Sequence, residues 1–307
     1  MFNVAGMTVT MIDSPARMRA MVSSSPEDWQ DAARRLWQPM AGMYFFIPGG
    51  PDLAAVHTQN FGFGPDAAND EILGAIDDLE RADAWGRIER ALDMGLRELA
   101  SANPTLTVPD LKVLLVLGDP TNRHFMDEIR GLSAFGGISG YIAITVWPTK
   151  EVLDRLEGIA LHELNHNVRY SPGGVVWEPQ TVTVGEHVVA EGLADLFAVG
   201  LVGEQGFTHF VSQETRTSNA VLHRVGEGLA VTGMQDFAAW VLGDASARLF
   251  GATPVGLPTG AGYAAGARIV TAYLDATGQP AAAAVTTPAE EILAVSLSQL
   301  GLGMLTR

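Results

Sequence analysis

Two short apolar runs near the middle of the chain set the strongest limit on its fold. The first is L-K-V-L-L-V-L at 111–117, which ends at Gly118, and the second is G-Y-I-A-I-T-V-W at 140–147, which ends at Pro148. Apolar runs of this length, closed by Gly or Pro, are typical of buried strands. Helical patterns occur on both sides of these runs. The sequence therefore predicts an α+β fold.

The stretch after the second run predicts a helix with a recognisable start. Thr149 is a suitable N-cap, Glu151 suits the first turn, and apolar residues recur at three- and four-residue spacing up to Val168. A second helical pattern begins at Glu186, after a loop that contains two prolines. Both segments are therefore expected to be helices.

The length and the patterns divide the chain near residue 148. A chain of 307 residues is long enough for two packed lobes. We expect residues 1–148 to form a mixed α/β N-terminal lobe, in which 70–99 also has helical spacing. Residues 149–307 are expected to form a mostly helical lobe that carries the two helices just described.

Charge and cysteine content exclude several classes of function. A formal net charge of −16 argues against binding to nucleic acid or to an anionic membrane surface, since both require basic patches. Without cysteine there is no disulfide, no thiolate metal site and no cysteine nucleophile, so a metal ion would need His, Asp or Glu ligands. No basic region precedes the first apolar stretch, and no run approaches the roughly 18 apolar residues of a membrane helix. We expect a soluble, cytoplasmic protein.

A metal-binding pattern lies within the first of the two helices. The chain reads A-L-H-E-L-N-H-N-V-R-Y at 160–170, so His162 and His166 share one helical face and Glu163 lies about a quarter-turn away. H-E-x-x-H on a helix supplies two imidazole nitrogens to Zn²⁺ and places a carboxylate beside the water at the open coordination position. The alternative is an ordinary helix with two surface histidines and a solvated glutamate.

A catalytic zinc site usually has three protein ligands, so a third ligand is expected elsewhere in the chain. The extended pattern H-E-x-x-H-x-x-G-x-x-H fails, because the chain has Arg169 and Pro172 at the positions of the glycine and the last histidine. Sites that use cysteine are excluded by composition. A third kind of site uses a glutamate on a following helix, and Glu191, in A-E-G-L-A-D, fits it.

Other residues leave alternatives open. His187 and Asp195, each four positions from Glu191, could replace it as the ligand, although a surface or hydrogen-bonding role is the simpler interpretation for His187. The stretch G-A-G-Y-A-A at 260–265 matches a dinucleotide-binding pattern in letters but no strand precedes it, so its small residues are expected to let a helix pack closely. Three further histidines have no partner pattern and are expected to be exposed or hydrogen-bonded: His57, His124 and His209.

The pairing of H-E-L-N-H with E-G-L-A-D resembles the gluzincins, which are zinc peptidases with two His and one Glu as ligands. More narrowly, 140–273 is similar to a bacterial family of formerly unknown function described as predicted zinc-dependent proteases. The resemblance implies a zincin-like fold in which Glu163 is the general base and Asp195 hydrogen-bonds a ligand histidine. It also implies three zinc ligands: His162, His166 and Glu191.

The resemblance further implies a zinc metallopeptidase that acts on a peptide or protein. The strand at 140–146 is expected to present its edge to an extended substrate. Hydrolysis of an amide also needs a donor for the oxyanion, and Tyr263, at an expected helix start, is our candidate, with His223 as the second. Tyr263 as a packing aromatic is the simpler reading. The alternative function is a zinc-containing, non-hydrolytic interaction module, although such a site has no need of Glu163 as a base.

Overall fold

The structure, a computed structural model, describes residues 3–4, 7–106 and 108–303. It has two compact units, which consist of Met1–Arg97 with Thr107–Asn167 and of Glu98–Leu106 with Val168–Arg307. The division falls within two helices, α5 (Ala84–Ala102) and α7 (Leu156–Arg169). The two lobes expected at 1–148 and 149–307 stay a prediction.

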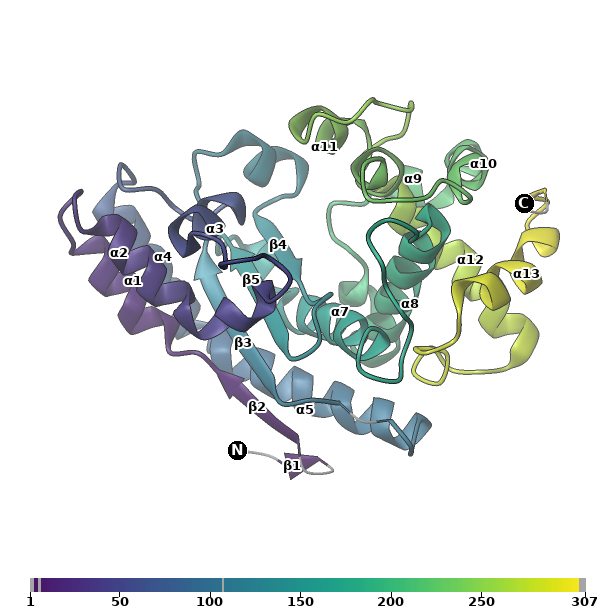
Figure 1. The fold of residues 1–307 in the computed structure, drawn as a ribbon, viewed down its shortest axis with the longest axis horizontal. Coiled ribbons are helices and arrows are strands. Elements are labelled where there is room, and N and C mark those ends of the chain that lie inside the picture. The colour runs from purple at the N-terminus through teal and green to yellow at the C-terminus, as the bar shows by residue number, and fades with distance from the viewer. Residues whose placement is uncertain (1–2, 5–6, 107, 304–307) are drawn as a thin grey trace. The chain divides into compact units, whose positions relative to one another are not determined.

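A single sheet forms the centre of the first unit (Figure 1). Its order among the described residues is β1-β2-β3-β5-β4. β3 pairs in parallel with both β2 and β5, whereas β1 and β4 are antiparallel to their neighbours. The strands are β1 (Asn3–Val4), β2 (Met7–Met11), β3 (Leu111–Leu117), β4 (Leu132–Phe135) and β5 (Tyr141–Val146). The two predicted apolar runs are therefore confirmed as neighbouring strands, and nearly all their side chains are buried.

The predicted edge position of the second run is wrong. β5 lies between β3 and β4, so both of its sides are paired. The loop 136–140 turns β4 back onto β5, with Phe135 opposite Ala143 and Leu132 opposite Val146. The edge strand on this side of the sheet is therefore β4. Its four residues, L-S-A-F, are too few to show the alternation that marks a strand in a sequence.

Helices pack on the sheet and on one another in the first unit. α1 (Ser14–Val22) and α4 (Asn69–Arg81) both contact β3. The helical pattern at 70–99 proves to be two helices, α4 and α5, because Asp83 adopts a left-handed conformation with φ of 52°. A right-handed helix cannot continue through such a residue.

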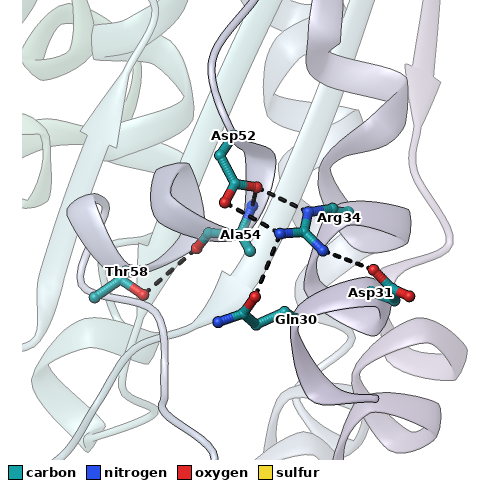
Figure 2. A network of polar contacts seen from close by, with 6 residues as sticks. All are labelled: Gln30, Asp31, Arg34, Asp52, Ala54 and Thr58. Atoms are coloured by element: carbon teal, nitrogen blue, oxygen red, sulfur yellow. Dashed lines mark hydrogen bonds and ion pairs between the residues drawn. The ribbon is translucent and has the colours of Figure 1, made fainter. Parts of the chain in front are cut away.

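An ion-pair network fixes the start of α3 (Leu53–Gln59) against α2 (Trp29–Trp37), as Figure 2 shows. Asp52 caps α3 by accepting a hydrogen bond from the Ala54 N–H at 3.1 Å. The same carboxylate accepts from Arg34 of α2 at 2.8 and 3.2 Å, and this bond is the main reason that the pKa of Asp52 lies below its usual value. The network lies beside a buried contact between the two helices. There, Trp37 Nε1 donates to His57 Nδ1 at 3.0 Å.

The second unit is helical and is organised around α8 (Val184–Val202). α8 packs against α12 (Ala261–Thr277) and α13 (Ala289–Gln299), as Figure 1 shows. The remaining helices of this unit are α9 (Gln213–Thr217), α10 (Asn219–Gly228) and α11 (Asp244–Leu249), with short 3₁₀ and π segments at Gly203–Gly206 and Ala238–Leu242.

α8 is an apolar helix of 19 residues, which is nearly the length of a membrane span. It nevertheless contains three acidic side chains, Glu186, Glu191 and Asp195. Across the part of the chain that the structure describes, no helix has both the length and the apolar character needed to cross a membrane.

Candidate metal centre

The helix that carries the H-E-x-x-H pattern begins later than predicted. Thr149 is an N-cap, as expected, and accepts a hydrogen bond from the Val152 N–H at 3.2 Å. The helix that it starts, α6 (Lys150–Leu153), ends after one turn. A separate helix, α7, begins at Leu156 and contains the whole pattern.

α7 is buried on every side around the pattern, and this overturns the surface-helix alternative. Every residue from 160 to 169 is buried. His162, Glu163 and His166 have exposed fractions of only 3%, 5% and 9%. A helix that is buried all round has no solvated face, so its polar side chains need partners within the protein or a bound species.

The two histidines direct one ring nitrogen each to the same point. His162 Nε2 and His166 Nε2 lie 3.0 Å apart, and the two rings meet edge to face with centroids 4.7 Å apart. Two nitrogen ligands of one tetrahedral Zn²⁺ lie about 3.3 Å apart, given bond lengths of about 2.0 to 2.1 Å. The separation of the two nitrogens is therefore close to that of a shared metal ion.

α8 presents the third predicted ligand from a tightly packed position. Thr183 caps the helix by accepting from the Glu186 N–H at 3.0 Å. Glu191, in the next turns, is 8% exposed. Its neighbour Gly192 lies where a Cβ atom would stand 2.2 Å from the backbone oxygen of Gly266 in α12. Only glycine permits this approach of the two helices, which fixes the backbone beside Glu191.

The structure brings the three predicted ligands together. His162, His166 and Glu191 each offer one ligand atom, and these atoms all lie within 4.8 Å of one another. Two imidazole nitrogens and one carboxylate oxygen form a donor set found in catalytic zinc sites, with a coordination position left open. The three side chains are all buried, and the group could hold a metal ion.

Comparison with known proteins places the chain that forms this site in a family. Residues 95–294, more than half of the chain and all three candidate ligands with them, match the family described as "Predicted Zn-dependent protease (DUF2268)". The chain belongs to this family. It is also 32% identical over 170 residues to the uncharacterized protein YjfC of Bacillus subtilis (strain 168). That match spans 54% of this chain and 54% of the relative, or about half of each protein. No solved structure matches the chain.

The third acidic residue of α8, Asp195, is anchored within the second unit. In this member of the family, Asp195 is 3% exposed and accepts hydrogen bonds from Thr208 Oγ1 at 2.8 Å and from the Thr208 N–H at 3.2 Å. His187 is also buried, with its ring against Trp177 and Phe237, so of the two interpretations given for it the surface position is excluded. Neither side chain belongs to the three-residue group described above.

The two candidate oxyanion donors differ in their surroundings. Tyr263 lies in the first turn of α12, as predicted, and its ring packs edge to face on Phe210 with centroids 5.4 Å apart. It is partly buried against the core of the second unit. His223 is exposed on α10. The small residues at 260–265 do allow close packing, as predicted, because a Cβ atom at Gly262 would stand 2.6 Å from Val241 Cα.

Sequence reasoning missed a buried ion pair next to the pattern. Arg169, the last residue of α7, is fully buried and donates to both carboxylate oxygens of Glu186, at 2.7 and 2.8 Å. Its Nη1 donates to the backbone oxygens of Val285 and Thr287. Burial raises the pKa of Tyr170 well above its usual value, so its hydroxyl stays protonated and donates to Glu186. An arginine three positions after the second histidine was the only signal available in the sequence.

Proposed function

We propose that this member of the family is a zinc-dependent metallopeptidase of the gluzincin type. The observation that supports it best is the buried group of His162, His166 and Glu191, whose ligand atoms lie within 4.8 Å of one another. Glu163, beside the first histidine, gives this group a base that a purely structural metal site does not need. The name of the family agrees with this reaction.

Each residue has a defined role in the proposed reaction. His162, His166 and Glu191 would hold the zinc ion, which when bound polarises the scissile carbonyl and lowers the pKa of a water molecule to about 7. Glu163 takes a proton from the attacking water and transfers it to the leaving amine. Asp195 orients a ligand histidine, and Tyr263 donates a hydrogen bond to the oxyanion.

The proposed substrate is a peptide or protein in an extended conformation. β4, the edge strand on its side of the sheet, has backbone groups that an added strand can pair with. The net charge of −16 favours a neutral or basic substrate over an acidic one, because the field of the protein repels anions. Nucleic acid and membrane surfaces are not proposed as partners.

The Glu163→Gln variant separates hydrolysis from metal binding. The amide has the size of the carboxylate but cannot take the proton, so peptide hydrolysis should fall by a factor of about 10² to 10⁴. The zinc content per chain should stay at the wild-type value. Both quantities can be measured on one preparation, by cleavage of a peptide library and by elemental analysis.

Two results would contradict the proposal. A zinc-loaded wild-type protein that cleaves no peptide in the library would favour the non-hydrolytic interaction module. A Glu163→Gln variant that loses zinc together with activity would show that Glu163 holds the site together rather than acting as a base.

A further inference from the structure

A glycine-rich loop at 136–140 lies against the helix that carries the general base. The loop reads G-G-I-S-G and connects the edge strand β4 to its neighbour β5. Within it, the Tyr141 N–H donates to the backbone oxygen of Ile138 at 3.1 Å, which closes a tight turn. Little else in the loop itself restricts its conformation, because three of its five residues are glycine.

Asn167 of α7 holds this loop through four hydrogen bonds. Its Oδ1 accepts from the Gly140 N–H at 2.9 Å. Its Nδ2 lies within hydrogen-bonding distance of three backbone oxygens, those of Gly136 at 2.9 Å, Ile138 at 3.0 Å and Tyr141 at 2.8 Å, so two of them share one of its two N–H groups. Asn167 is fully buried, so none of these bonds competes with water. A side-chain amide suits this position because its NH₂ group donates and its oxygen accepts hydrogen bonds.

The other end of the loop lies directly on Glu163. A Cβ atom at Gly136 would stand 2.3 Å from the backbone oxygen of Glu163 and 3.0 Å from its Cβ. Glu163 and Asn167 are four positions apart in α7 and therefore share one helical face. The loop thus runs along this face, with its Gly136 end against the proposed base and both of its ends bonded to the amide of Asn167 one turn later.

We propose that Asn167 is a positioning residue for Glu163. By holding the loop against the helix, it limits the conformations of the glutamate side chain to those that the loop leaves free. This inference rests on the proposed function, because it concerns the base of that reaction. A displacement of about 1 Å in a reacting group can reduce a rate about 10²-fold, so a loosened loop should affect turnover more than binding.

The Asn167→Asp variant tests the clamp with the smallest change of shape. A carboxylate can still accept from Gly140, but it cannot donate to the three backbone oxygens and repels them instead. We expect faster hydrogen–deuterium exchange of the Gly140 amide and of its neighbours in the loop. We also expect kcat, counted per bound zinc, to fall by a factor of about 10 to 10², with KM changed by less than about twofold.

A second variant disturbs the same contact from the side of the loop. Gly136→Ala forces the loop away from the Glu163 backbone and should lower kcat in the same way. Gly137→Ala is the matched control, because its added methyl group meets only the ring of Phe135, at 3.1 Å, and that ring is 46% exposed and can move. The control should keep kcat and KM near the wild-type values.

The outcomes separate this proposal from the proposed function. Unchanged exchange at Gly140 in Asn167→Asp would overturn the clamp, whatever reaction the protein catalyses. Faster exchange with unchanged kcat per bound zinc would show that the loop does not position the base. A wild-type protein without peptidase activity would refute the proposed function, and the proposal about Glu163 with it, while the exchange measurement would still decide whether Asn167 holds the loop.

Discussion

Metal binding by this protein should depend on the positions of two single atoms, the Nε2 atoms of His162 and His166. These atoms lie 3.0 Å apart inside a buried helix, so a cation that binds there can accept a lone pair from each ring. The histidines, rather than the surrounding apolar residues, should therefore decide whether metal is bound.

His166→Ala should reduce the zinc content from about one ion per chain to a small fraction of that value. The substitution removes one of three ligands, and a site with two protein ligands binds zinc much more weakly. Elemental analysis after gel filtration measures the content. His223→Ala is the control, because this exposed histidine lies on α10 and should leave the zinc content unchanged. Wild-type zinc content in His166→Ala would refute the ligand assignment.

Tyr263→Phe should lower kcat by a factor of about 10² to 10³ and leave the zinc content intact. The change removes only the hydroxyl, so the edge-to-face contact with Phe210 is kept. Steady-state kinetics of this variant and of His223→Ala should be compared directly. A normal kcat for Tyr263→Phe with a large loss for His223→Ala would assign the oxyanion to His223.

At the scale of elements, the crossing of α8 and α12 has the tightest backbone packing near the candidate ligands. Gly192 and Gly266 face each other, and a Cβ atom at Gly266 would stand 2.0 Å from the backbone oxygen of Val188. Neither position has room for a side chain. By contrast, a Cβ atom added at Gly200, in the same helix α8, would have no atom within 4 Å. Two glycines of one helix thus have opposite sensitivities to substitution.

Gly192→Ala should lower the free energy of unfolding by at least about 1 to 3 kcal/mol, because the methyl group must push two helix backbones apart. Gly200→Ala should instead raise it by about 0.5 to 1 kcal/mol, since alanine favours the helix and meets no neighbour. Denaturant titration followed by circular dichroism measures both variants. Equal effects of the two substitutions would show that the crossing is not tightly packed.

At the scale of the whole molecule, the net charge is strongly negative, yet one buried neutral side chain should control the free energy of unfolding in mild acid. The chain has a formal net charge of −16. His57, fully buried in the first unit, accepts from Trp37 through Nδ1 and so must donate to the backbone oxygen of Phe63 through Nε2. Burial lowers its pKa from 6.5 to about 4. The folded protein therefore keeps this histidine neutral where the unfolded chain would charge it.

Stability should consequently fall as the pH is lowered from about 6.5 to about 4. In this window the unfolded state binds a proton at His57 and the folded state does not, so acid favours unfolding, and the effect vanishes above pH 6.5. The separation of the two pKa values corresponds to about 3 kcal/mol. Unfolding followed by the fluorescence of Trp29 and Trp37, whose rings contact His57, gives the pH profile.

The His57→Gln variant isolates this contribution. Glutamine can pair with the same neighbours but does not titrate, and both proteins share the remaining histidines. The wild type should therefore lose free energy of unfolding below pH 6.5 relative to His57→Gln, and the difference between the two pH profiles measures this loss. Parallel profiles would contradict the prediction.

The sequence by itself determined the features that depend on local order. The apolar runs at β3 and β5, the Thr149 cap and the helical start near Tyr263 were all predicted, because strand burial, capping and helical spacing leave a trace within a few residues. The sequence also predicts the candidate ligands His162, His166 and Glu191. The H-E-x-x-H spacing indicates the two histidines, because residues four apart in a helix share one face, and the resemblance to the gluzincins implies Glu191.

Only the tertiary structure decided the features that depend on residues distant in sequence. The four-residue strand β4 takes the sheet edge that was expected for β5, because pairing, and not local pattern, determines which strand is outermost. The partners of Asn167 and Arg169 lie between 17 and 118 positions away, and neither residue has a motif of its own. A buried hydrogen-bonding group requires a partner but does not specify where in the chain that partner lies. The environment of the base was therefore decided by folding.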